Sequence, residues 1–504
     1  MSFNSLDFIL LIFITAILYY ALPHKLRNPL LLVSSYVFYA AFDLGLTSYI
    51  VLCTLLTYVT AILVEKNRGT AKAKTWAAVG VVANLLPLAF FKYYNFAVKT
   101  FLGMLKLSES RIDSFTLKLL VPLGISFIVF SVVSYIIDVY RGKLSAERNL
   151  FKLALYISFF PKVVQGPIER AGDIIPQFDE VHKFDDEGFR KGLLLILYGL
   201  FMKMVVADRA AVIVDTIYGS MSAYSGAAVA FATAMFAIQI YCDFAGYSYT
   251  AIGAAKILGF DFKANFRQPY MSLTVGEFWR RWHISLNNWL RDYLYIPLGG
   301  NRCSPARKNF NILVVFAVSG LWHGADWGYV IWGVINAVYI MIEGVFKARR
   351  KKKGKTLIIE SEEQSAKRVI LRTLKRLWNF ILITFTWLFF RAQTLPTAAY
   401  AGARIIKHFD FNGFIHYCGH RMLKGAGTTL YGLDVIWGMT LLFACIVIVV
   451  VIDMLAYRYD LTDRLSKCNF IIRWAVYLIL IFAIILFGVY GYGYSASAFI
   501  YAAF

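Results

Sequence analysis

The chain has 504 residues, of which 59% are hydrophobic, 17% aromatic and only 16% charged, and its mean hydropathy is +0.60. A soluble protein would carry about a quarter charged residues, so an ordinary soluble domain is excluded and an all-α polytopic membrane protein is predicted. The net charge of +22 collects in short loops between apolar runs. We therefore expect membrane lipids as partners and no nucleic acid.

Apolar runs of membrane length follow one another along the whole chain. No linker or internal repeat divides them, so we predict a single membrane domain over residues 1–504. Residues 6–22 are expected to be a retained first helix, because no basic residues precede them and no cleavage site follows. The predicted runs are 6–22, 29–45, 46–64, 76–91, 119–140, 150–165, 192–207, 226–245, 310–346, 377–392, 434–453 and 473–493.

One acidic residue lies inside an apolar run, Asp243 in Tyr241-Cys-Asp-Phe-Ala-Gly-Tyr-Ser248. A charge at membrane depth is costly unless it is paired or functional. The sequence leaves three roles open for Asp243: substrate binding, capping, or an ion pair with an arginine.

Residues 278–293 have the pattern of an amphipathic helix in the membrane interface. At 100° per residue, Trp279 and His283 share an apolar face, whereas Arg280, Arg281 and Arg291 lie on a cationic face. We therefore predict one helix that directs His283 into the protein and these arginines toward the cytosol.

The basic loops predict the orientation of the chain. Residues 347–376 contain twelve Lys/Arg against three Glu, and residues 263–308 contain eight Lys/Arg against two acids. Both segments are expected to be cytoplasmic. The 37-residue apolar run between them, 310–346, must then enter the membrane and return. A break between Gly320 and Gly328 would give two arms with His323 at the apex; a single crossing plus a tilted helix is the alternative.

His323 is a candidate catalytic residue, because lipid does not solvate an ionisable group and its flanking glycines admit another backbone or a substrate. A buried neutral imidazole can accept a proton from a hydroxyl. A histidine bonded only for structural reasons is the alternative. Two histidines with Asp326 nearby make a poor metal-ligand set, and the six cysteines are scattered, so no metal is expected.

At several motifs the chain resembles the membrane-bound O-acyltransferase superfamily, in its bacterial alginate O-acetylase-like branch. The longest matching stretch runs from Gly276 to Arg302, and Ser319-Gly-Leu-Trp-His-Gly-Ala325 is similar to the family's catalytic-histidine segment. The other matching motifs are Gly166-Pro-Ile-Glu-Arg170 with Pro176-Gln177, Asp243-Phe-Ala-Gly-Tyr-Ser248, and Phe499-Ile-Tyr501.

The resemblance implies eleven to twelve membrane helices, with re-entrant and interfacial helices, around a core crossed by a tunnel. It implies that His323 is catalytic and that His283 is its partner in the tunnel. The acyl donor would be a cytoplasmic thioester, either acetyl-CoA or another acyl thioester. This donor is a substrate, and no bound cofactor is expected. An extracytoplasmic esterase-like (SGNH) partner would pass the acyl group to a polysaccharide, which places the chain in a bacterial cytoplasmic (inner) membrane. Residues expected to bind substrate or donor are Asp243, Trp279, Arg280, Arg281, Arg291 and Trp322.

Two other functions stay open. One is D-alanyl transfer to teichoic acids from a carrier-protein thioester. The other is a non-enzymatic role in polysaccharide export or as a scaffold, although a pore would need polar residues along several helices, whereas intramembrane polarity here is confined to a few positions.

Overall fold

The apolar runs of the sequence become helices, and all regular secondary structure in the described residues is helical. The computed structural model describes residues 3–41, 44–106, 109–117, 124–163, 166–352, 366–420 and 435–489. The family-like ending Phe499-Ile-Tyr501 and residues 353–365 of the basic loop therefore lie outside the described residues. The chain divides into two units, one of residues 1–197 and 247–264, the other of residues 198–246 and 265–504.

Six of the described helices are long and apolar enough to cross a membrane. They confirm a polytopic all-α membrane protein, whereas the expected total of eleven to twelve crossings and the central tunnel stay predictions. The six segments are Thr47–Lys66, Ala71–Met104, Gly226–Ile257, Trp327–Arg350, Gly438–Ala456 and Phe470–Phe487.

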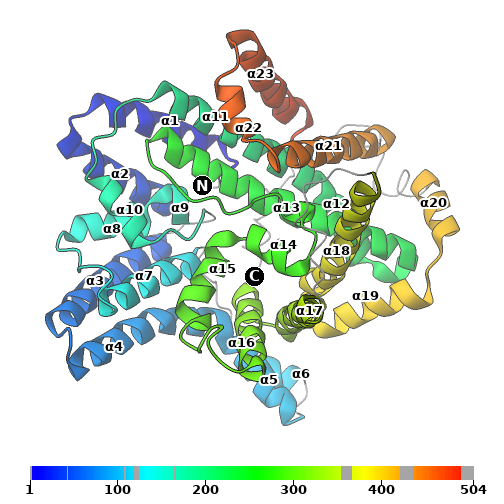
Figure 1. The fold of residues 1–504 in the computed structure, drawn as a ribbon, viewed down its shortest axis with the longest axis horizontal. Helices are drawn as coiled ribbons and strands as arrows, with labels where there is room; N and C mark the ends of the chain where they lie inside the picture. Colours follow the sequence, from blue (N-terminus) through cyan, green and yellow to red (C-terminus); the bar gives the residue numbers. More distant parts are fainter. Residues whose placement is uncertain are drawn as a thin grey trace. The chain divides into compact units, whose positions relative to one another are not determined.

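In the first unit, long helices pack against one another (Figure 1). A Cβ atom on Gly80 of α4 would lie 2.8 Å from Oγ1 of Thr60 in α3 and 3.1 Å from Cδ1 of Ile136 in α7, so these helices approach closely at a glycine. The helices are α1 (Leu6–Ala21), α2 (His24–Ala40), α3 (Leu44–Lys66), α4 (Ala71–Leu88), α5 (Tyr94–Met104), α6 (Glu109–Ser114), α7 (Ile125–Tyr140), α8 (Leu150–Ser158), α9 (Phe160–Val163), α10 (Ala171–Ile174) and most of α11 (Asp186–Leu200).

The predicted run 150–165 is wrong as a single span. The helix α8 has nine residues, and the backbone leaves the helical region at Phe159 before α9 begins. Nine residues extend only about 14 Å, which is less than half of the hydrocarbon thickness.

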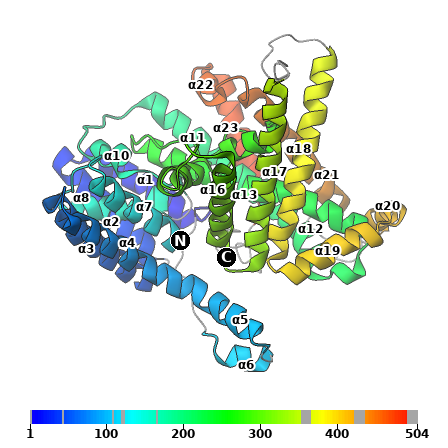
Figure 2. The ribbon, with the colours of Figure 1, turned by 60° about the horizontal axis from the view of Figure 1, so that its bottom comes forward.

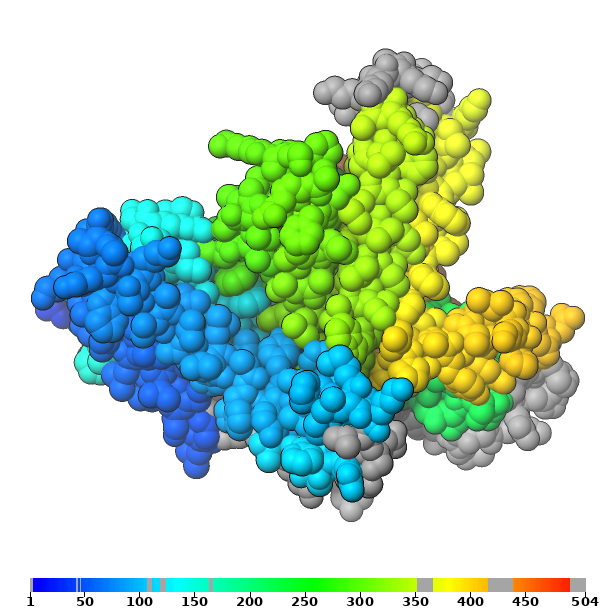
Figure 3. All heavy atoms as spheres, turned by 90° about the horizontal axis from the view of Figure 1, so that it is seen from below, coloured from blue at the N-terminus to red at the C-terminus, as the bar shows by residue number. Residues whose placement is uncertain are grey.

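The second unit contains the helices that carry the candidate site (Figure 2). Helix α16 packs along α17, and α17 packs along α18; Figure 3 shows the surfaces of α17 and α18 side by side. The helices of this unit are α12 (Asp208–Gly219), the first part of α13 (Gly226–Ile257), α14 (Val275–Arg281), α15 (Ile284–Leu290), α16 (Pro305–His323), α17 (Trp327–Lys352), α18 (Ala366–Ala392), α19 (Leu395–Lys407), α20 (Phe411–His420), α21 (Val435–Ala456), α22 (Leu461–Ser466) and α23 (Phe470–Phe487).

The predicted break in the 310–346 run is confirmed. Helix α16 ends at His323, α17 begins at Trp327, and the two pack against each other. Their contact requires glycine, because a Cβ atom on Gly320 would lie 2.2 Å from the carbonyl oxygen of Tyr329, and one on Gly333 would lie 2.1 Å from that of Phe316. Gly320 thus admits another backbone, one of the two roles that the sequence left open.

Candidate active site

His323 is the last residue of α16 and is buried, with 3% of its surface exposed. Three aromatic rings surround its imidazole, at centroid distances of 4.8 Å for Trp322, 5.2 Å for Trp332 and 5.4 Å for Phe390. Gly324 ends the helix, and a Cβ atom there would lie 2.1 Å from the ring of Tyr329. The hairpin therefore holds an imidazole in an apolar, aromatic environment, where hydrogen bonds and charges act more strongly than in water.

His283 lies on a break between two short helices, which corrects the prediction of one helix over 278–293. Helix α14 ends at Arg281, α15 begins at Ile284, and His283 has φ = +43° and ψ = +55°. Left-handed backbone is uncommon for a residue with a Cβ atom and is maintained only by its surroundings. The side-chain amide of Asn287 donates to the carbonyl oxygens of Trp279, at 2.5 Å, and Trp282, at 2.6 Å, which ends α14.

Asn265 orients the imidazole of His283. Its Oδ1 lies 3.1 Å from Nδ1 of His283 and accepts hydrogen bonds from the backbone N–H of Ser285, at 3.2 Å, and the Ser285 hydroxyl, at 2.9 Å. An amide oxygen only accepts, so Nδ1 carries the proton and Nε2 has the lone pair that can take up another. Sequence reasoning missed Asn265, because it is 18 positions away and no local pattern marks it.

Burial keeps His283 neutral. The residue is 1% exposed, and burial lowers the pKa of its imidazole to about 3. The neutral ring therefore predominates at physiological pH and can act as a base or a hydrogen-bond acceptor.

Trp322 lies close to both histidines. Its ring centroid is 6.0 Å from that of His283 and 4.8 Å from that of His323. The structure therefore brings both histidines to one indole, although they come from segments forty residues apart. Trp279 lies in the same aromatic region: it packs on Trp332 and donates its indole N–H to Oδ1 of Asn336, at 3.2 Å.

The three predicted arginines do not form one cationic face, since the helix is broken between them. Arg281 pairs with Glu277, at 2.9 Å, and its guanidinium lies 4.6 Å from the centroid of the Tyr457 ring. Arg280 is exposed, and Arg291 is exposed beside Asp292. Arg280 and Arg291 are thus the two that solvent reaches most freely.

Asp243 is buried in an ion pair, with lysine as the partner in place of the arginine considered from the sequence. Nζ of Lys203 lies 2.6 Å from Oδ1 of Asp243 and 2.8 Å from Oδ1 of Asp208. All three side chains are at most 3% exposed. Sequence reasoning missed Lys203, although a lysine within the apolar run 192–207 was a visible signal.

We expect Lys203→Met to destabilise the protein strongly. The substitution leaves two buried carboxylates without their cation, and removal of one member of a buried pair costs about 3–5 kcal/mol. Thermal unfolding of the detergent-purified protein measures the effect. Lys467→Met is the matched control, because Lys467 forms a surface pair with Asp463 and its side chain is 61% exposed. Equal melting temperatures for both variants would contradict a stabilising role for the Lys203 pair.

The site and the fold define a polytopic membrane protein with two buried histidines close to one tryptophan. Within the described ranges, no three His, Cys, Asp or Glu side chains lie close enough together to bind a metal ion. The model of the membrane-bound O-acyltransferase (MBOAT) family matches residues 31–356, which include both histidines. The chain belongs to this family and is a membrane O-acyltransferase.

Curated relatives share most of the chain. The probable alginate O-acetylase AlgI of Azotobacter vinelandii is 38% identical over 384 residues, 76% of this chain and 73% of the relative. The peptidoglycan O-acetyltransferase of Helicobacter pylori is 30% identical over 411 residues, 75% of each chain. The teichoic acid D-alanyltransferase of Bacillus subtilis is 28% identical over 294 residues, 54% of this chain and 69% of the relative.

Proposed function

We propose that the protein transfers an acetyl group from a cytoplasmic thioester, acetyl-CoA, to a hydroxyl of an extracytoplasmic polysaccharide. The observation that carries this proposal is the pair of buried histidines at Trp322 in a membrane-embedded unit. The relatives named as O-acetylases support acetyl as the acyl group, because their identity and coverage exceed those of the D-alanyltransferase. D-alanyl transfer is therefore the less favoured alternative, and the relatives' names argue against a non-enzymatic conduit.

In the proposed reaction, His323 accepts the proton of the acceptor hydroxyl as the oxygen attacks the thioester carbonyl. The C–O bond forms, the C–S bond breaks, and the proton passes to the leaving thiolate. His283, whose Nδ1 is held by Asn265 and whose Nε2 carries the lone pair, provides a second acceptor in the same aromatic region. The acceptor hydroxyl belongs either to the polysaccharide or to an esterase-like (SGNH) partner that carries the acetyl group onward. The bacterial cytoplasmic membrane is the proposed location, since it separates these two substrates.

Donor binding gives a direct test of the proposed cationic contacts. If acetyl-CoA is attracted by Arg280 and Arg291, replacement of both by Gln should raise the KM for acetyl-CoA about fivefold or more, with a smaller change in kcat. Titration of the purified enzyme with acetyl-CoA measures this. Arg458→Gln/Lys467→Gln is the control, because it removes the same charge from exposed positions.

An unchanged KM together with reduced abundance of the Arg280/Arg291 variant would contradict donor binding. In that case these arginines only anchor the protein to lipid headgroups. Acceptance of a D-alanyl carrier-protein thioester in place of acetyl-CoA would overturn the proposed donor and acyl group.

A further inference from the structure

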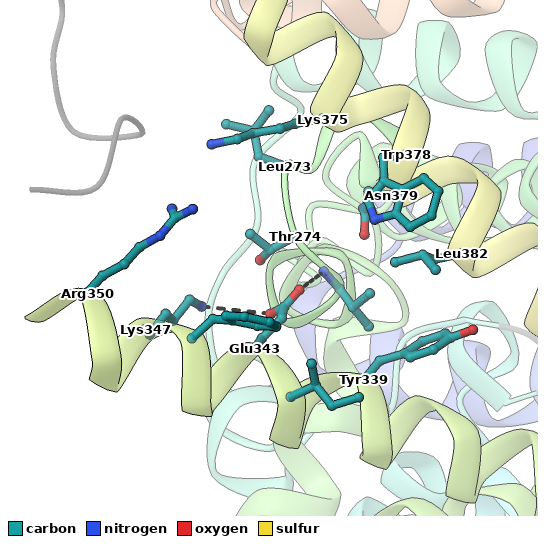
Figure 4. Close-up of a pocket in the computed structure, with 13 residues that line it drawn as sticks. Leu273, Thr274, Tyr339, Glu343, Lys347, Arg350, Lys375, Trp378, Asn379 and Leu382 are labelled. Carbon is teal, nitrogen blue, oxygen red and sulfur yellow. Dashed lines mark hydrogen bonds and ion pairs between the residues drawn. The ribbon is translucent and has the colours of Figure 1, made fainter. Parts of the chain in front are cut away.

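A pocket of about 300 Å³ lies between α17, α18 and residues 273–275 (Figure 4). Its walls are largely apolar and include Ile342 and Phe346 from α17 and Trp378 and Leu382 from α18. Phe346 is 57% exposed and Trp378 is 62% exposed. Large apolar side chains exposed beside a membrane helix favour contact with an acyl chain over contact with water.

Three cations lie at the polar end of this pocket: Lys347 and Arg350 on α17 and Lys375 on α18. In Figure 4 the side chains of Arg350 and Lys375 extend toward the same side of the pocket. Lys347 lies 3.8 Å from Glu343, whereas no acidic side chain in the described part of the chain pairs with Arg350 or Lys375. Burial, and then the charge of Arg350, lower the pKa of Lys375. The rim therefore has a surplus of positive charge that an anion would neutralise.

Glu343 does not supply that anion. Its carboxylate accepts hydrogen bonds from the backbone N–H groups of Val275, at 2.5 Å, and Gly276, at 3.1 Å. These bonds provide acceptors for two backbone N–H groups in the first turn of α14, and they hold the carboxylate on the inner side of the pocket. With Glu343 included, the three cations still leave a local charge of about plus two.

A buried hydrogen-bond acceptor also lines the pocket. Nδ2 of Asn379 donates to the carbonyl oxygen of Ser272, at 3.2 Å, so its Oδ1 is the free end of the amide. Asn379 is 3% exposed, and this oxygen has no donor among the described residues. A buried acceptor without a donor is costly, so a ligand hydroxyl that reached this oxygen would relieve the cost.

We propose that this pocket binds an anionic phospholipid, and that the headgroup of this lipid carries hydroxyl groups. The phosphate lies between Arg350 and Lys375, a headgroup hydroxyl donates to Asn379, and an acyl chain runs along Phe346 and Trp378. Basic pockets at the ends of membrane helices are known to bind such headgroups. The site is separate from the two histidines and does not depend on the proposed acetyl transfer.

The test uses a photoactivatable phosphatidylglycerol in phosphatidylcholine vesicles that contain the full-length protein. We expect cross-links to peptides that contain Ile342–Phe346 and Trp378–Leu382. Arg350→Gln/Lys375→Gln should reduce cross-linking there about tenfold or more, since each basic residue contributes substantially to anionic-lipid binding. Arg349→Gln/Lys367→Gln is the matched control: it removes the same charge from exposed positions of the same helices that do not line the pocket. This control should keep its cross-links.

Competition with two unlabelled ligands shows whether the bound phosphate belongs to a lipid or to coenzyme A. Unlabelled phosphatidylglycerol should displace the probe, whereas free coenzyme A should not. Displacement by coenzyme A alone would assign the pocket to the thioester donor and overturn the lipid proposal. Equal cross-linking in the two double variants, or equal labelling by a photoactivatable phosphatidylcholine, would also overturn it. Asn379→Leu should weaken labelling by phosphatidylglycerol, and unchanged labelling would remove the hydroxyl contact.

Discussion

Replacement of His323 by Asn is expected to abolish acetyl transfer while leaving protein abundance close to normal. Asparagine keeps a polar side chain of smaller size among Trp322, Trp332 and Phe390 but cannot accept a proton at neutral pH. Loss of a general base typically lowers the rate by about 10²–10⁴. The measurement is the acetyl content of the polysaccharide at matched protein level.

His408→Ala is the control for this experiment, because His408 ends α19 with an exposed side chain. It should keep wild-type acetylation. Near-native acetylation in the His323→Asn variant would show that this histidine is structural, the alternative that the sequence left open.

Replacement of His283 by Ala is expected to lower kcat by about 10² or more, with a change of less than about threefold in the KM for acetyl-CoA. An interaction that is stronger in the transition state than in the ground state has this kinetic signature. Steady-state kinetics of the purified enzyme measure both constants.

Asn265→Ala tests how His283 acts. Asn265 is a positioning residue: its amide oxygen fixes the proton on Nδ1 of His283 and so leaves the lone pair on Nε2. Its loss should lower kcat by a smaller factor than His283→Ala, and the double variant should be no slower than His283→Ala alone. Additive losses in the double variant would contradict an effect of Asn265 through His283.

The break in the 310–346 run was predictable from the sequence, because its length, the flanking charges and the glycines all favour it. A 37-residue apolar run between two basic segments is longer than one straight span needs, and its glycines mark where it can break, although a single crossing plus a tilted helix fitted the same pattern. The fold class follows in the same way from apolar runs of membrane length. The fold class and the helix break depend on local composition, which can be read from the sequence without knowledge of the tertiary structure.

The break at His283 was not predictable from periodicity. The residues from 278 to 293 keep a helical pattern, but the side chains of Asn265 and Asn287 supply hydrogen bonds that end α14 and hold His283 in a left-handed conformation. Lys203 was visible as a lysine inside an apolar run, but its pairing with Asp243, forty positions away, was not predictable from the sequence. Long-range polar contacts of this kind depend on the tertiary packing.

The central claim is that the two-histidine site moves an acetyl group from a cytoplasmic thioester to an external hydroxyl. Sealed membrane vesicles of either orientation, given radiolabelled acetyl-CoA, test it most directly. We predict that inside-out vesicles, which expose the cytoplasmic face, accumulate alkali-labile acetyl label on the polysaccharide, and that right-side-out vesicles or the His323→Asn variant do not. Equal label in both orientations, or wild-type label in the His323→Asn vesicles, would contradict the account.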